Sequence, residues 1–198
     1  MRPIAMFPLG SVLFPHMPLP LRVFEPRYLA MLADILKEEP SEFGVVLIER
    51  GSEVGGGDVR VRTGTLARVS DLDTAGEAVL MIAQGAARFT VEEWLPDDPY
   101  PMARVRELPD PEWDPALEPK RAEAEGLVRR VLARLAEEEL SPWPADVGLD
   151  DDPAAASWQL AAIAPLNALD QLELLASDSY ERLLTRLVEL VTEVDETY

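Results

Sequence analysis

The sequence contains no cysteine and a single histidine, and these two absences narrow its possible chemistry. Without cysteine the chain cannot form a disulfide, a thiolate metal site or a cysteine nucleophile. His16 alone cannot build a histidine metal cluster, and no serine is placed to use it as the base of a catalytic triad. We therefore expect no catalytic residues, no metal site and no cofactor, with His16 lying in a loop.

Long apolar runs are also missing. The first 21 residues are apolar, but five prolines interrupt them, and no small-residue cleavage site of a signal peptide follows. No stretch reaches the roughly 18 apolar residues that a membrane-spanning helix needs. These features predict a cytoplasmic protein that has no membrane partner.

Signatures of nucleotide and calcium chemistry are incomplete. The glycine run at residues 55–57 lacks the Lys-Ser or Lys-Thr of a phosphate loop, and a flexible hairpin turn explains it better. Glu92 and Glu93 are neighbours on a predicted strand and would point to opposite faces. The aspartates at 150–152 lack the alternating ligands of an EF-hand and are expected in a solvated loop before a helix. A hydrolase that uses carboxylates is the remaining catalytic alternative.

Negative charge is abundant. The chain has 37 acidic and 18 basic residues, which gives a formal net charge of -19. Such a surface repels phosphate backbones and anionic lipid, so nucleic acid is not an expected partner. The charge also favours solubility.

The first 114 residues predict mostly strands with one inserted helix. The continuous apolar run at 43–48 is typical of a strand covered on both faces. Residues 59–63 alternate between apolar and polar or charged side chains, which indicates that one face of this strand is exposed to solvent. Residues 66–69 continue the strand after a possible bulge at Gly64. Pro26 suits the first position of a helix that ends before Pro40. Further strands are expected at 4–7, 21–24, 78–83, 88–94 and 102–108.

The remainder of the chain predicts helices. Residues 109–119 are rich in proline and acidic side chains, as expected of a linker. Apolar residues then recur at helical spacing, Trp158 among them, and Asp178 with Glu181 has the spacing of a capping box at the start of the last helix. We therefore expect an α+β chain with a β-rich part at 1–114 and a helical part at 115–198.

Apolar side chains near prolines are the candidates for a binding surface. Phe14 and Met17 lie in a proline-rich stretch, and Trp143 lies between two prolines. Core packing is one interpretation of all three residues. If they are exposed instead, they are candidate peptide contacts, since large apolar groups and adaptable methionine suit varied partners.

Several ordered motifs resemble the N-terminal substrate-binding domain family of Lon proteases. The stretch from Phe7 to Leu32 carries FP, PL and FEPRY in the family's order. GTLARV begins at Gly64 and GAARF begins at Gly85. A helical part from Trp158 to Leu187 carries the remaining matches, which are Pro165, Gln171, Leu174, Leu175, Glu181, Arg182 and Leu183.

This resemblance implies a fold and a role. The family implies a PUA-like pseudo β-barrel with one inserted helix, followed by a C-terminal α-helical bundle. It also implies a non-catalytic module that binds unfolded or extended polypeptide segments or acts as a proteolysis adaptor. The chain has no Walker lysine and no room for a peptidase domain, so we expect a stand-alone form without ATPase or protease. The alternative is a PUA-like domain that senses a small molecule.

Overall fold

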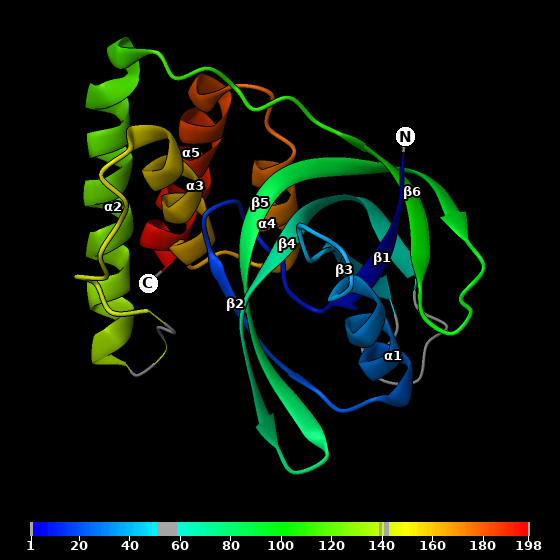
Figure 1. Cartoon of the computed structure of the whole chain (residues 1–198). Helices are drawn as coiled ribbons and strands as arrows, with labels where there is room; N and C mark the ends of the chain where they lie inside the picture. The colour runs from blue at the N-terminus through cyan, green and yellow to red at the C-terminus, as the bar shows by residue number, and fades with distance from the viewer. Residues whose placement is uncertain (1, 51–58, 139, 141–142, 198) are drawn as a thin grey trace. The chain divides into compact units, whose positions relative to one another are not determined.

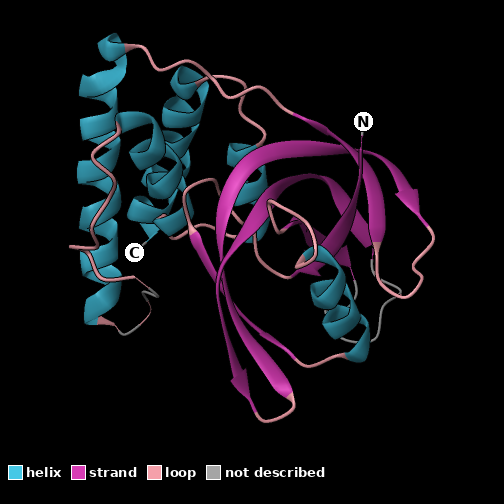
Figure 2. Ribbon diagram, viewed as in Figure 1, coloured by secondary structure: helices cyan, strands magenta, loops and turns pink. Residues whose placement is uncertain are grey.

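The computed structural model describes residues 2–50, 59–138, 140 and 143–197, and the chain divides into two compact units. Unit 1 spans Met1–Pro109 and unit 2 spans Asp110–Tyr198, so the division falls slightly before the predicted one after Asp114. Strands make up most of unit 1, whereas unit 2 is helical (Figures 1 and 2). The predicted α+β class is confirmed. The glycine run at 55–57 lies outside the described residues.

The strands of unit 1 form one mixed sheet in the order β2-β5-β4-β3-β1-β6. Their bounds are β1 Arg2–Leu9, β2 Pro18–Val23, β3 Glu42–Arg50, β4 Val59–Ala75, β5 Ala78–Leu95 and β6 Met102–Glu107. β1 and β3 are parallel, and the other neighbours are antiparallel. An additional β5–β6 pairing joins five strands in a ring, while β2 is attached to β5 alone among the described strands. The sheet is therefore partly closed and is not a regular barrel.

Two hydrophobic cores lie on the two faces of this sheet. Ile4 and Met6 of β1 belong to one core, which the five ring strands supply, and the alternate residues Ala5 and Phe7 belong to the other. The second core also contains the buried face of α1 (Pro26–Ile35), including Met31. β3 contributes to both cores, as the continuous apolar run at 43–48 predicts. The predicted inserted helix is present, and Pro26 lies in its first turn.

β4 and β5 are longer than the sequence predicts and form one hairpin. Gly64 lies inside the continuous strand β4, as predicted, whereas Gly85, which separates two predicted strands, lies inside the continuous strand β5. A Cβ at Gly64 would lie 2.2 Å from the Val45 carbonyl oxygen, and one at Gly85 would lie 2.1 Å from that of Phe14. These glycines therefore mark places where another backbone passes closely, and they do not end the strands.

The described residues of unit 2 form a short 3-10 turn, η1, and four helices. The bounds are η1 Pro115–Leu117, α2 Glu118–Glu137, α3 Pro153–Ile163, α4 Ala168–Leu175 and α5 Tyr180–Thr197. Trp158 is buried, as predicted, with its ring 5.8 Å from that of Tyr180. Leu132 of α2 and Leu184 of α5 are also fully buried.

Side-chain caps fix where three of these helices begin. Asp152 accepts a hydrogen bond from the Ala155 amide, so the predicted acidic loop supplies the cap of α3. Asn167 caps α4 in the same way. At α5 the predicted start at Asp178 is wrong, because the Arg182 amide donates to the Ser179 hydroxyl at 3.3 Å. A serine at this position satisfies one of the first free amides of the helix.

Glu125 of α2 joins two arginines of the same helix. Its carboxylate accepts hydrogen bonds from Arg121 and Arg129, each at 2.8 Å. Arg129 also donates to the carbonyl oxygens of Ala145 and Val147, which fixes the loop after α2. Burial raises the pKa of Glu125, but the hydrogen bonds from the two arginines outweigh it, and the net shift is downward.

We expect Glu125→Gln to lower the free energy of unfolding by about 1 kcal/mol at neutral pH. Because the pKa of Glu125 is lower in the folded protein, its ionised form stabilises the fold above the unfolded-state pKa of about 4.5. That stabilisation is lost as the pH falls through the lowered folded-state pKa. Urea denaturation at several pH values measures it. Glu123→Gln is the control, because Glu123 is exposed on the same helix. Equal effects of the two variants at neutral pH would contradict this account.

Candidate functional site

A small apolar hollow in unit 1, which we call the β2 pocket, is the best candidate for a binding site. It has a volume of about 200 Å³ and lies between the end of β1, the strand β2 and the first turn of α1. Phe24, which directly follows β2, is 57% exposed beside it. The pocket is lined by Phe7, Leu9, Pro20, Leu21, Arg22, Val23, Phe24, Glu25 and Tyr28.

Stacked aromatic rings form the rigid part of this pocket. The rings of Phe7 and Tyr28 are nearly parallel, with centroids 4.1 Å apart and an interplanar angle of 13°. The guanidinium of Arg27 lies 4.5 Å from the centroid of the Tyr28 ring and donates to Glu25 at 3.2 Å. The Glu25–Arg27 ion pair therefore packs against the Tyr28 ring and helps to hold it in place.

The free edge of β2 has few hydrogen-bond donors. The Gly85 amide donates to the Met17 carbonyl, and the register then directs the backbone groups of Leu19, Leu21 and Val23 toward β5. Pro18, Pro20 and Arg22 consequently face the open edge, and proline has no amide hydrogen. An incoming strand would find three carbonyl acceptors but only one donor, from Arg22. Side-chain contacts must therefore contribute most of any binding at β2.

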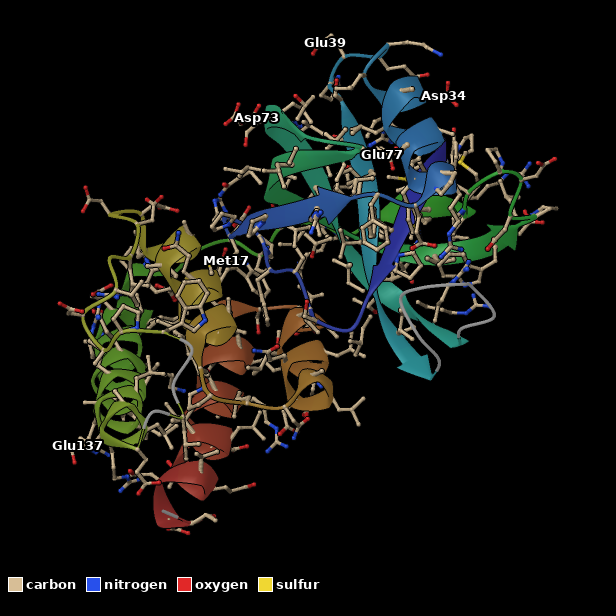
Figure 3. The ribbon with its side chains drawn as sticks, turned by 90° about the horizontal axis from the view of Figure 1, so that it is seen from below. Met17, Asp34, Glu39, Asp73, Glu77 and Glu137 are labelled. Carbon is tan, nitrogen blue, oxygen red and sulfur yellow. The ribbon has the colours of Figure 1, made fainter. Side chains whose placement is uncertain are left out.

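The predicted contact residues Phe14, Met17 and Trp143 lie in different environments. Phe14 is only 1% exposed, so its side chain is part of the interior and the core interpretation holds for it. Met17, labelled in Figure 3, is half-buried just before β2 and packs against the second core. His16 is exposed with a φ of 63°, and its amide donates to the Gly85 carbonyl. None of these residues lines the β2 pocket.

Trp143 belongs to a separate hollow within unit 2. This hollow has a volume of about 370 Å³, and most of the residues that line it are apolar. Trp143 is half-buried there, and Leu140 beside it is exposed. The lining residues are Leu135, Leu140, Trp143, Ala162, Ala164, Pro165, Leu166, Gln171 and Val194. The prediction that Trp143 contacts a peptide stays a prediction.

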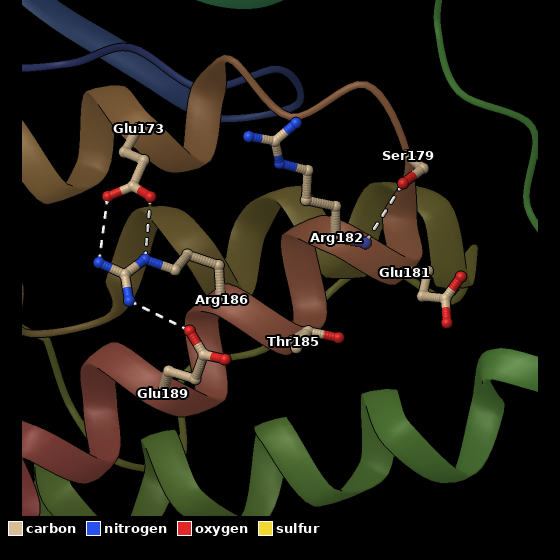
Figure 4. Close-up of a pocket in the computed structure, with 7 residues that line it drawn as sticks. All are labelled: Glu173, Ser179, Glu181, Arg182, Thr185, Arg186 and Glu189. Atoms are coloured by element: carbon tan, nitrogen blue, oxygen red, sulfur yellow. Dashed lines mark hydrogen bonds and ion pairs between the residues drawn. The ribbon is translucent and has the colours of Figure 1, made fainter.

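A larger groove between α4 and α5 is polar, and ion pairs join several of its side chains (Figure 4). Arg186 donates to both carboxylate oxygens of Glu173, at 2.9 and 3.2 Å, and to Glu189 at 3.1 Å. These interactions, the hydrogen bond to Glu173 first among them, raise the pKa of Arg186. Because Glu181 also lines the groove, its carboxylates outnumber its arginines. The groove therefore offers no site for an anion.

The sequence reasoning missed Phe24, although a signal was present. Leu19, Leu21 and Val23 alternate toward the interior, which places Phe24 in the outward register with Pro20 and Arg22. An aromatic residue in an outward position is the kind of exposed apolar group that marks a binding site.

Three or more His, Asp or Glu side chains do not gather in a metal-binding arrangement anywhere in the described part of the chain. None of the described helices is long and apolar enough to cross a bilayer.

Comparisons with known proteins point to one family. The model of the "ATP-dependent protease La (LON) substrate-binding domain" matches residues 3–193. The Lon protease of Anaeromyxobacter dehalogenans is 37% identical over 103 residues, which are 51% of this chain and 12% of that protein. Lon protease 2 of Myxococcus xanthus is 35% identical over 127 residues, 63% of this chain and 15% of that protein. The chain thus spans only a small part of the curated relatives it matches.

Solved structures agree with these matches. The crystal structure of a Lon N-terminal domain protein from Xanthomonas campestris has a TM-score of 0.67 and 29% identity, and the match covers 96% of this chain and 98% of that one. The N-terminal domain of a Mycobacterium avium complex Lon protease also has a TM-score of 0.67, with the same coverage of both chains. Its identity is 16%, so it supports the fold alone.

Proposed function

The chain belongs to the LON substrate-binding domain family, and we propose that it is a substrate-recognition module that binds unfolded or extended polypeptide segments at the β2 pocket. The observation that carries this proposal is Phe24, which is exposed beside an apolar hollow within the region matched to the family. The module performs no catalysis and presents bound segments to a separate protease. The protease activity of the relatives is not part of the proposal, because the chain spans 12 to 15% of their length.

An unfolded polypeptide exposes apolar side chains that can fill the β2 pocket. Its apolar side chains are in water, and one large side chain would fill much of a hollow of about 200 Å³. Covering the exposed part of the Phe24 ring would remove about 100 Å² of apolar surface from water, which is worth about 2.5 kcal/mol. Such a contact is strong enough to anchor a weak, reversible complex.

The backbone of the bound segment has a secondary role. The open edge of β2 presents carbonyl oxygens at Pro18, Pro20 and Arg22, and these can accept hydrogen bonds from peptide amides. Since the two prolines remove two donors from that edge, a regular strand addition is incomplete. Recognition therefore depends on the apolar side chains of the segment more than on its backbone, which suits a module with varied substrates.

The proposal is tested by titrating the protein with a polypeptide that cannot fold because its disulfides are reduced and its cysteine thiols are alkylated. The native, disulfide-bonded form of the same polypeptide is titrated separately. We expect micromolar binding of the unfolded form and none of the native form, measured by calorimetry. Equal affinities for the two forms, or no heat with either, would overturn the proposal.

Phe24→Ser should weaken binding of the unfolded polypeptide by roughly tenfold to a hundredfold, because it removes the exposed ring beside the pocket. Leu36→Ser is the matched control, since Leu36 is an exposed apolar residue of the same unit that does not line the pocket. The folded state of both variants is checked by circular dichroism. If both variants weaken binding equally, the β2 pocket is not the site.

A further inference from the structure

The strand β5, which lies between β2 and β4 in the sheet, carries exposed aliphatic residues on its outward face. Leu80 and Ile82 of β5 are 41% and 43% exposed, although β5 has a neighbour on each side. In the register, Ile82 lies between Pro20 of β2 and Asp71 of β4, and Leu80 lies between Arg22 and Asp73. We call this surface, formed by Pro20, Leu80 and Ile82 with Asp71 and Asp73 beside them, the arm face.

The arm face continues from the β2 pocket. Pro20 and Arg22 line that pocket and also project on the same side of the sheet as Leu80 and Ile82. An extended segment of a few residues, at about 3.3 Å per residue, is long enough to reach from the pocket across the two aliphatic side chains. The pocket and the arm face therefore form one continuous surface for a single extended segment.

Carboxylates border one side of this surface. Asp71 and Asp73 are exposed, and their side chains accept hydrogen bonds from the amides of Leu72 and Thr74. Within the described residues neither carboxylate has a salt bridge, and Arg68, the basic residue nearest to them in β4, pairs with Glu42. Glu77 adds a third exposed carboxylate at the turn of the hairpin (Figure 3). Cross-strand neighbours lie about 5 Å apart, so these charges are within reach of a ligand that covers Leu80 and Ile82.

We propose that the arm face selects polypeptide segments in which apolar residues are accompanied by lysine or arginine, and that it disfavours segments with acidic residues. The aliphatic side chains supply the general attraction, and Asp71 and Asp73 supply the charge complementarity. Arg22 lies across Leu80 from Asp73, so it borders the opposite side of the surface and does not neutralise the aspartates. This inference rests on the proposed function and names its substrate class.

Three synthetic peptides test this inference. They share one apolar core and carry lysine, serine or glutamate on both flanks, and their affinities are measured by fluorescence anisotropy in 0.1 M and 1 M NaCl. We expect the lysine peptide to bind roughly three- to tenfold more tightly than the glutamate peptide at the lower salt concentration, with the serine peptide between them. Because the Debye length falls from about 10 Å to about 3 Å, the difference should nearly vanish at 1 M.

Two matched double variants distinguish a preference caused by the arm face from one caused by the overall negative charge. Asp71→Asn with Asp73→Asn should remove most of the difference between the lysine and glutamate peptides, while the serine peptide binds as before. Glu137→Gln with Glu138→Gln changes the net charge equally at the end of α2, where both residues are exposed, and should leave the difference intact.

Each alternative outcome has a distinct meaning. Equal affinities for the three peptides would overturn the inference and leave the proposed function standing. An equal loss of selectivity in both double variants would also overturn it, because the preference would then come from net charge. If none of the three peptides binds, the proposed function fails and the inference fails with it.

Discussion

Replacing Gly85 with alanine is expected to destabilise unit 1 by roughly 2–4 kcal/mol, because a methyl group has no room there. The added Cβ would lie 2.1 Å from the carbonyl oxygen of Phe14, which is backbone and cannot rotate away. The strand and the loop before β2 are also tied together here, since the Gly85 amide donates to Met17 and the Gly85 carbonyl accepts from His16. Urea denaturation followed by circular dichroism measures the loss.

This substitution should also disturb binding, because the loop that it displaces leads directly into β2. Gly126→Ala is the control for replacing a glycine by alanine. A Cβ at Gly126 meets nothing within 4 Å, and the residue lies inside α2. The free energy of unfolding of this variant should therefore rise by about 0.5–1 kcal/mol. A Gly85→Ala protein as stable as the unsubstituted one would show that the close approach of the two backbones is wrong.

The second large effect is expected in unit 2, where Trp158→Ala should lower the free energy of unfolding by about 3–5 kcal/mol. Trp158 is 1% exposed, and its ring lies 5.8 Å from that of Tyr180, which in turn has an edge contact with Trp113 at 5.4 Å. Removal of the indole would leave a large cavity beside the Tyr180 ring. Thermal and urea unfolding, monitored by near-ultraviolet circular dichroism, would detect the loss of aromatic packing.

Trp143→Ala is the comparison for Trp158→Ala, since Trp143 is half-buried at an open hollow. It should cost about 1 kcal/mol, because less apolar surface returns to water. Equal costs for the two tryptophans would contradict the assignment of Trp158 to the interior.

Particular residues show why much of the fold was predictable. The run at 43–48 is apolar without alternation because β3 contributes to the cores on both faces of the sheet. Pro26 and the apolar spacing after it locate α1 correctly. The full extent of β5 was not predictable, because Gly85 separates two apolar runs and has the sequence signature of a strand break. The actual role of Gly85, a close contact with the backbone of Phe14, depends on a segment far away in the sequence.

The candidate site was less predictable than the fold. The sequence places Phe14 and Met17 in the same proline-rich stretch, but only the folded chain shows that Phe14 is buried while Met17 is half-exposed. Phe24 was recognised only as part of the FEPRY motif, and its exposure was not predicted, because a motif does not show which side of a strand faces solvent. The cap of α5 shows the same limit, since Asp178 and Ser179 are both good capping residues and only the hydrogen bond to Ser179 distinguishes them.

Amide hydrogen exchange with and without a saturating unfolded polypeptide tests the central claim most directly, because it locates the binding surface without any substitution. The amides of Arg22 and Phe24 are the main reporters, since β5 does not cover the outward amide of Arg22 and Phe24 follows the strand. We predict slower exchange at these two amides, and a smaller effect around Leu80 and Ile82 of β5. Saturated binding that leaves β2 unchanged and slows exchange only in unit 2 would contradict the account.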